Sequence, residues 1–102
     1  MTTAKPAYQP LPPTAAIMQL PANGYTHLST FSGCGGSCLG FRLAGFQTVY
    51  ANDIDAHARA CYRLNFPSPI DGRDIRFVTG ADLLERTGLA RGALDVFEGS
   101  PP

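Results

Sequence analysis

The chain has 102 residues, of which 44% are hydrophobic, and its eight basic and eight acidic residues give a formal net charge of zero. This length suits one small domain or part of a larger one, and the balanced charge argues against a broad basic face that neutralises many DNA phosphates. The sequence also lacks the run of about 18 apolar residues that spans a membrane and the basic and apolar regions of a signal peptide. We therefore expect no membrane partner, and most contacts to any DNA must come from other regions.

Residues 1–24 are rich in proline and show no helical or strand periodicity. We expect an extended, poorly ordered leader, because proline interrupts regular structure. A segment that docks as a polyproline II helix is the alternative to a plain tail. The prolines are Pro6, Pro10, Pro12, Pro13 and Pro21.

From Tyr25 onward, short apolar stretches alternate with helical patterns. Strands are predicted at residues 27–31, 47–51, 74–78 and 94–97. Helices are predicted at residues 36–44, 55–65 and 81–87. The second helix is amphipathic, and Asp55 or Asn52 supplies its N-cap. This alternation predicts an α/β fold with a mostly parallel sheet and helices on both faces.

A glycine turn joins the first predicted strand to the first helix. Gly33, Gly35 and Gly36 permit positive φ and a close approach of a ligand to the backbone. The helix that follows offers free N–H groups to a carboxylate or a phosphate. The spacing is G-x-G-G, and Cys38 stands where the third glycine of a dinucleotide-binding fingerprint would lie, which weakens a nicotinamide assignment. A purely structural turn is the alternative.

Two acidic residues are candidate ligands of a nucleoside. Asp53 ends the second predicted strand twenty residues after Gly33, where its carboxylate can accept both hydroxyls of a ribose. The alternative role of Asp53 is a helix N-cap. Asp74 begins the third predicted strand and can accept a bond from an adenine amino group while Ile75 packs on the ring. A surface turn is the alternative for Asp74.

The segment Gly99-Ser-Pro-Pro102 follows the last predicted strand, at the edge where open α/β sheets bind ligands. Two prolines fix φ and make a rigid platform. A simple loop is the alternative.

Three cysteines, Cys34, Cys38 and Cys61, lie in apolar or glycine-rich surroundings. Their number is odd, they form no C-x-x-C pair, and they are not spaced with His27 or His57 as zinc ligands. We expect reduced packing residues of a cytoplasmic protein, with no metal site and no nucleophile among them.

Together these motifs are similar to those of a known family. In chain order they are Phe31-Ser-Gly-Cys-Gly-Gly36, Leu39-Gly-Phe, Ala44-Gly-Phe46, Ala51-Asn-Asp53-Ile-Asp55, Asp74-Ile75 and Gly99-Ser-Pro-Pro102. Over residues 28–102 the chain resembles the N-terminal half of the cytosine-C5 DNA methyltransferases. The resemblance implies a Rossmann-like fold that binds S-adenosylmethionine, in a prokaryotic enzyme from a restriction–modification system.

The resemblance also implies a role for each motif. Phe31 lies near the adenine, and the backbone from Gly33 to Gly36 holds the methionine end. Asp53 takes the ribose hydroxyls, where the family more often has glutamate. The expected cofactor-binding residues are Phe31, Ser32, Gly33, Cys34, Gly35, Gly36, Asp53, Ile54, Asp74 and Ile75, with Ile54 covering the adenine face and Asp74 and Ile75 reading its edge.

In the family, the Pro-Pro pair is followed directly by the cysteine nucleophile, so Ser100, Pro101 and Pro102 are expected beside the target cytosine. We expect residues 25–102 to form the N-terminal half of the catalytic domain, with no catalytic residue of their own. The remaining half, in the same chain or a second one, and double-stranded DNA are the expected partners.

Two alternatives stay open: a non-catalytic remnant or cofactor-binding subunit of a split enzyme, and a nicotinamide-binding domain. The family-like strand order 3-2-1-4 leaves the fourth strand as an unpaired apolar edge, which is an aggregation hazard. We therefore expect that residues 1–102 are not a complete folding unit.

Overall fold

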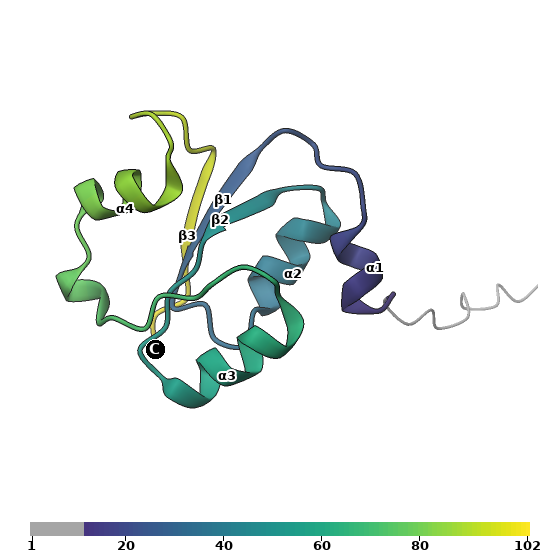
Figure 1. The fold of residues 1–102 in the computed structure, drawn as a ribbon, viewed down its shortest axis with the longest axis horizontal. Coiled ribbons are helices and arrows are strands. Elements are labelled where there is room, and N and C mark those ends of the chain that lie inside the picture. Colours follow the sequence, from purple (N-terminus) through teal and green to yellow (C-terminus); the bar gives the residue numbers. More distant parts are fainter. Residues whose placement is uncertain (1–11) are drawn as a thin grey trace, which may run out of the picture.

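The computed structural model describes residues 12–102. It contains a parallel sheet whose strand order is β2-β1-β3, with β1 in the centre. The elements in chain order are α1 (Thr14–Met18), β1 (Thr26–Thr30), α2 (Gly36–Leu43), β2 (Gln47–Tyr50), α3 (Ala56–Asn65), the 3₁₀ helix η1 (Ile75–Phe77), α4 (Gly80–Thr87) and β3 (Val96–Gly99) (Figure 1).

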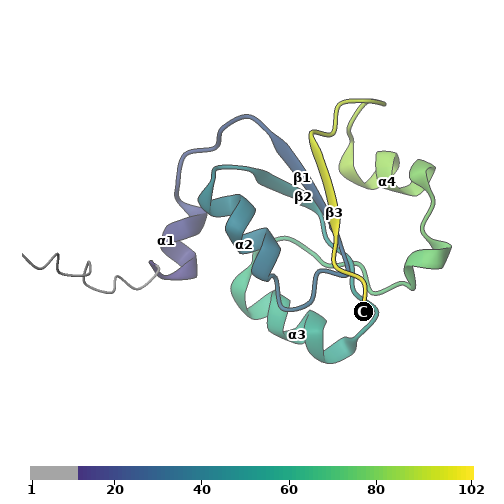
Figure 2. The ribbon, with the colours of Figure 1, turned by 180° about the vertical axis from the view of Figure 1, so that it is seen from behind.

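Helices cover both faces of the sheet, as predicted. Figures 1 and 2 show α1, α2 and α3 on one side of the strands and α4 on the other. The alternation of side chains along β1 explains this arrangement, because neighbouring residues point to opposite faces. His27 stacks on Phe41 of α2 with ring centroids 4.1 Å apart, whereas Leu28 and Leu83 of α4 line one cavity on the opposite face.

The helices on the first face share one core. Cys38 of α2 packs with Tyr62 of α3 and with Phe66 and Ile70, which follow α3. The rings of Tyr62 and Phe66 are stacked 4.6 Å apart. Asp55 supplies the N-cap of α3 by accepting a bond from the backbone N–H of His57, which confirms one of the two predicted caps.

A helix forms within the predicted extended leader. Thr14–Met18 is helical, Ile17 is buried, and α1 packs against α2. The Arg42 side chain of α2 donates to the backbone carbonyls of Met18 and Leu20 and ties this segment down. The prediction of an extended conformation is therefore wrong for residues 14–18, because their packing against α2 determines their conformation. Residues 1–11 lie outside the described residues.

The prediction of a third strand at residues 74–78 is also wrong. Its residues form the 3₁₀ helix η1, which Asp74 caps by accepting a bond from the backbone N–H of Arg76 at 2.9 Å. The chain instead pairs with the end of β2 through one isolated parallel bridge between Asn52 and Asp71. The sheet therefore has three strands in the order β2-β1-β3, and a single bridge at Asp71 stands where the expected order 3-2-1-4 has its outermost strand.

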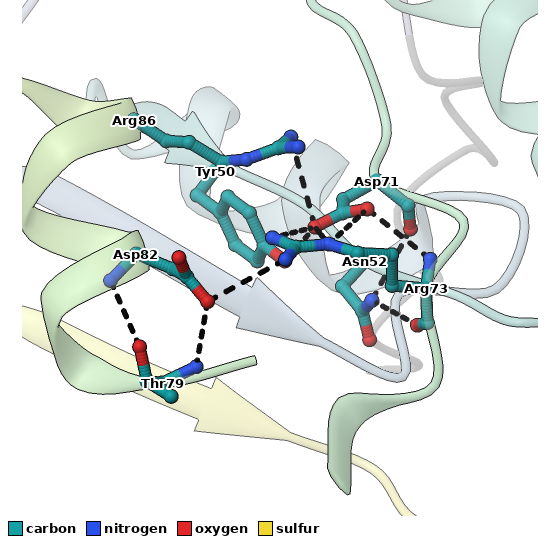
Figure 3. A network of polar contacts seen from close by, with 7 residues as sticks. All are labelled: Tyr50, Asn52, Asp71, Arg73, Thr79, Asp82 and Arg86. Atoms are coloured by element: carbon teal, nitrogen blue, oxygen red, sulfur yellow. Dashed lines mark hydrogen bonds and ion pairs between the residues drawn. The ribbon is translucent and has the colours of Figure 1, made fainter. Parts of the chain in front are cut away.

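A polar network around Asp71 fixes this bridge (Figure 3). The buried carboxylate accepts a bond from the Tyr50 hydroxyl at 2.7 Å and from Nη2 of Arg73 at 2.9 Å, and Nη1 of Arg86 in α4 lies 3.6 Å away. Burial raises the pKa of Asp71, but the bonds from Arg73 and Tyr50 outweigh it and lower this pKa to about 2. Arg73 also reaches Asp82 of α4 at 3.4 Å, so the network joins β2, the bridge and α4.

Within residues 12–102, none of the helices combines the length and the apolar character needed to cross a membrane.

Candidate functional site

The turn after β1 is bonded to the end of β2. The backbone N–H of Ser32 donates to the carbonyl of Asn52 at 2.8 Å, and the N–H of Asn52 donates to the Ser32 hydroxyl at 3.0 Å. Ser32 is buried, and its hydroxyl donates in turn to Ser29. The Ser32 side chain therefore supports the turn from the protein interior and does not face an open surface.

Positive φ angles carry the chain through this turn. Phe31 has φ +51°, which is a strained value for a residue with a side chain. Gly35 has φ +98°, and a Cβ placed on it would lie 2.1 Å from the Phe66 ring, so both the conformation and the space require glycine. In contrast, a Cβ on Gly33 or Gly36 would meet no atom within 4 Å. The outer side of the turn is thus open to a ligand.

Asp53 lies against this turn. Its Oδ2 accepts a bond from the backbone N–H of Gly33 at 2.9 Å, and its Oδ1 accepts one from the N–H of Asp55 at 2.9 Å. Because Asp55 caps α3, the alternative role of Asp53 as that cap is not needed. Each oxygen keeps a further lone pair, so the carboxylate can still accept hydroxyl groups. The neighbouring Ile54 is 62% exposed, which leaves a large apolar side chain uncovered beside it.

The other two residues expected to contact the nucleoside, Asp74 and Ile75, lie in a different segment, at the start of η1. The Asp74 carboxylate holds Arg76 through Nε at 3.1 Å and Nη2 at 2.8 Å, and these bonds lower its pKa. Ile75 is half-buried. Among the residues of the structure, no hydrogen bond joins Asp74 to Asp53 or to the glycine turn. The link is indirect, because the N–H of Asp53 donates to the carbonyl of Asp71 at 3.0 Å.

Asn52 is a residue whose role at the site was not expected. It is buried, and its Nδ2 donates to the carbonyls of Asp71 at 3.2 Å and Arg73 at 2.8 Å (Figure 3). Asn52 therefore holds the backbone just before Asp74. An asparagine directly after an apolar strand was the available signal, but the sequence suggested only a helix cap.

The segment after β3 ends at the same edge of the sheet. β3 runs parallel to β1 with Gly99 beside Thr30, so Ser100, Pro101 and Pro102 follow at the side of the Phe31 turn (Figure 1). A Cβ on Gly99 would lie 2.5 Å from the Thr30 hydroxyl oxygen and 3.7 Å from the Phe31 ring. The three residues themselves are exposed.

Two of the three cysteines have raised pKa values. The neighbouring Cys61 thiol raises the pKa of the exposed Cys34, and burial raises the pKa of Cys38. A nucleophilic cysteine needs the opposite shift. The residues that the structure describes contain no cluster of three or more histidine, cysteine or acidic side chains that could hold a metal ion.

Comparison with known proteins gives one consistent result. A family model described as C-5 cytosine-specific DNA methylase matches residues 25–102. The Type II methyltransferase M.AgeI of Thalassovita gelatinovora is 41% identical over 76 residues, which cover 74% of this chain and 18% of the relative. The Type II methyltransferase M.AquIA of Picosynechococcus sp. is 37% identical over 76 residues, covering 74% of this chain and 31% of the relative.

A third relative is the Type II methyltransferase M.XorII of Xanthomonas oryzae pv. oryzae, 36% identical over 76 residues, which cover 74% of this chain and 18% of the relative. The chain therefore spans less than a third of the length of each of these proteins. No solved structure matches the chain significantly.

Proposed function

Because the chain belongs to the C-5 cytosine-specific DNA methylase family, we propose that residues 25–102 supply the cofactor-binding half of an enzyme that methylates C5 of cytosine in DNA. The methyl donor is S-adenosylmethionine, whose sulfonium supplies an electrophilic methyl group. The observation that carries the proposal is the 2.9 Å hydrogen bond from Gly33 to Asp53. It brings a glycine turn and a carboxylate together at one edge of a parallel sheet, where such folds bind nucleosides.

The described residues fit this cofactor. The open side of Gly33 and Gly36 leaves room for the methionine end beside the first N–H groups of α2. Asp53 accepts the ribose hydroxyls through the lone pairs that Gly33 and Asp55 leave free. The exposed Ile54 packs on the adenine, with Phe31 near the ring.

The edge of the adenine is read by Asp74 and Ile75. Asp74 carries its negative charge beside Arg76, and a lone pair of its carboxylate accepts a bond from the adenine amino group. The Asn52 side chain holds the backbone that leads to Asp74. Ser32, Cys34 and Gly35 complete the turn that surrounds the methionine end.

The target cytosine lies next to Ser100, Pro101 and Pro102. None of the three cysteines is assigned the role of nucleophile here: the pKa values of Cys34 and Cys38 are raised, and Cys61 belongs to α3 and not to the segment after β3. Double-stranded DNA is bound mainly by the rest of the protein, since this chain has no net charge. The enzyme acts in the cytoplasm of a prokaryote, within a restriction–modification system.

The rest of the domain covers the face of the sheet that carries α4. Phe97 of β3 is 59% exposed, and together with Leu84 and Leu94 it lines a cavity of about 400 Å³. A polypeptide that adds a strand beside β3 would bury these side chains and pair an edge that is otherwise a site of aggregation.

The proposal is tested by isothermal titration of the intact protein with S-adenosylhomocysteine and, separately, with NAD. We expect binding of S-adenosylhomocysteine alone, and a loss of affinity of about tenfold or more in Asp53→Ala, because each charge-assisted bond contributes about 1.5–3 kcal/mol. Glu85→Ala, which removes an exposed carboxylate from α4, is the matched control and should bind normally. Binding of NAD alone, or an unchanged affinity in Asp53→Ala, would overturn the proposal.

A further inference from the structure

A continuous polar chain crosses the face of the sheet that α2 covers. The Glu98 carboxylate of β3 accepts a hydrogen bond from the Ser37 hydroxyl of α2, with an oxygen–oxygen distance of 2.8 Å. The same oxygen lies 3.1 Å from Nε2 of His27 in β1. Nδ1 of His27 lies 2.9 Å from the hydroxyl of Thr48 in β2. One side chain thus connects all three strands, directly or through His27, with the first turn of α2.

The chemistry of these groups fixes the direction of each bond. An ionised carboxylate only accepts, so Nε2 of His27 carries the proton and Nδ1 accepts from Thr48. Burial lowers the pKa of His27, against the opposing effect of Glu98, and the ring is neutral. Burial raises the pKa of Glu98, but the hydroxyl groups around its carboxylate, with Ser37 bonded at 2.8 Å, and the His27 ring outweigh this effect and leave the pKa below its usual value. The network is therefore fully satisfied with Glu98 charged.

Two directly bonded members of this network, Ser37 and Glu98, lie beside two different parts of the proposed site. Ser37 directly follows the glycine turn that is open to the cofactor. Glu98 directly precedes Gly99, which packs tightly on Thr30, and the Thr30 hydroxyl also donates to the Glu98 carbonyl at 3.4 Å. The side chain and the backbone of Glu98 thus hold the start of the 99–102 segment from two sides.

We infer that Glu98 is a positioning residue, which acts through Ser37 to fix residues 99–102 relative to the glycine turn. It touches neither cofactor nor cytosine. The inference rests on the proposed function, because the distance that Glu98 sets is then the distance between the methyl donor and its target. A misplacement of about 1 Å at such a site lowers the rate by about 100-fold, so the loss should appear in kcat.

The experiment compares Glu98→Leu, Glu98→Gln and Ser37→Ala in the intact protein, with Glu85→Leu on α4 as the matched control. Glu98→Leu should lower kcat at least tenfold while the Kd for S-adenosylhomocysteine changes less than threefold. Glu98→Gln should retain most of the rate, because its amide oxygen can still accept hydrogen bonds from both Ser37 and Nε2 of His27. Ser37→Ala should lower kcat in the same direction, and the Glu98→Leu/Ser37→Ala variant should be no slower than Glu98→Leu alone.

Amide hydrogen exchange at Gly99 and Ser100 provides a second readout that needs no methyl transfer. It should become at least tenfold faster in Ser37→Ala and in Glu98→Leu, and stay unchanged in Glu85→Leu. Normal kcat and exchange in Ser37→Ala, additive losses in the double variant, or equal losses of kcat and affinity would each overturn the inference. If the wild type neither binds S-adenosylhomocysteine nor methylates DNA, the proposed function fails, and the exchange rates alone decide whether Glu98 positions residues 99–102.

Discussion

Replacing Gly35 by alanine tests the geometry of the turn most directly. Gly35 has φ +98°, and a Cβ there would lie 2.1 Å from Cε2 and 2.8 Å from Cζ of Phe66. The Phe66 ring cannot readily move away from the added methyl group, because it is buried and stacked on Tyr62. The positive φ costs about 1–2 kcal/mol for a residue with a Cβ, and overpacking a core costs about 1–3 kcal/mol more. We expect Gly35→Ala to destabilise the domain by about 2–5 kcal/mol.

Gly36→Ala is the matched control for this change. Gly36 has no positive φ, and a Cβ on it would meet no atom within 4 Å. Its stability should be unchanged or slightly raised, since alanine suits a helix better than glycine. Its affinity for S-adenosylhomocysteine should nevertheless fall, because the added methyl group enters the open side of the turn.

Two measurements test this prediction. The first is the free energy of opening from hydrogen exchange at the amide of Leu39, which donates to the Gly35 carbonyl at 2.9 Å. The second is the midpoint of urea unfolding of the intact protein. Both should fall in Gly35→Ala, and Phe66→Ala should make the added cost of the alanine smaller. A Gly35→Ala variant within about 0.5 kcal/mol of the wild type, the range of neutral surface changes, would refute the reasoning.

Three further predictions follow from side chains beside the site. The pKa of Asp71 is lowered to about 2, so its ionised form stabilises the fold by about 2 kcal/mol above pH 4. This stabilisation is lost as the pH falls toward 2. In acid unfolding experiments, Asp71→Asn should not show this part of the decrease in stability. Tyr50→Phe should lower the free energy of unfolding by about 1.5–3 kcal/mol, because it removes a hydrogen bond to a buried charge. Tyr25→Phe changes an exposed ring and should unfold like the wild type. N-ethylmaleimide should modify Cys34 slowly, because its pKa is raised, and S-adenosylhomocysteine should protect it; an equal rate with and without that ligand would contradict its place at the cofactor.

The glycine turn and Asp53 could be predicted because their signals are local. A strand that turns through glycines into a helix needs no information from distant residues, and the parallel sheet then places the end of β2 beside that turn. The structure brings Gly33 and Asp53 within a hydrogen bond of each other. Their contact with a cofactor stays a prediction.

The third strand could not be predicted, because distant residues decide its structure. The pattern of Ile75, Phe77 and Val78 favours a strand, yet Asp74 caps a 3₁₀ helix and leaves Phe77 70% exposed. The bridge is held instead through Asp71, whose partners lie in β2 and α4. The helix at residues 14–18 was not predicted for the same reason, because it is stabilised by packing against the distant helix α2.

This difference bears on how the proposed site selects its ligand. Asp53 is held by two backbone N–H groups beside the sheet, so its carboxylate is already fixed for the proposed ribose contact. Asp74 lies instead on a short 3₁₀ turn that depends on the side chains of Asn52 and Arg76. A loss of the Asn52 side chain should therefore weaken discrimination between adenosyl and other nucleosides more than it weakens the ribose contact. On the proposed function, the residues at the end of the sheet would then contribute mainly affinity for the ribose, and the Asp71 network would contribute discrimination between bases.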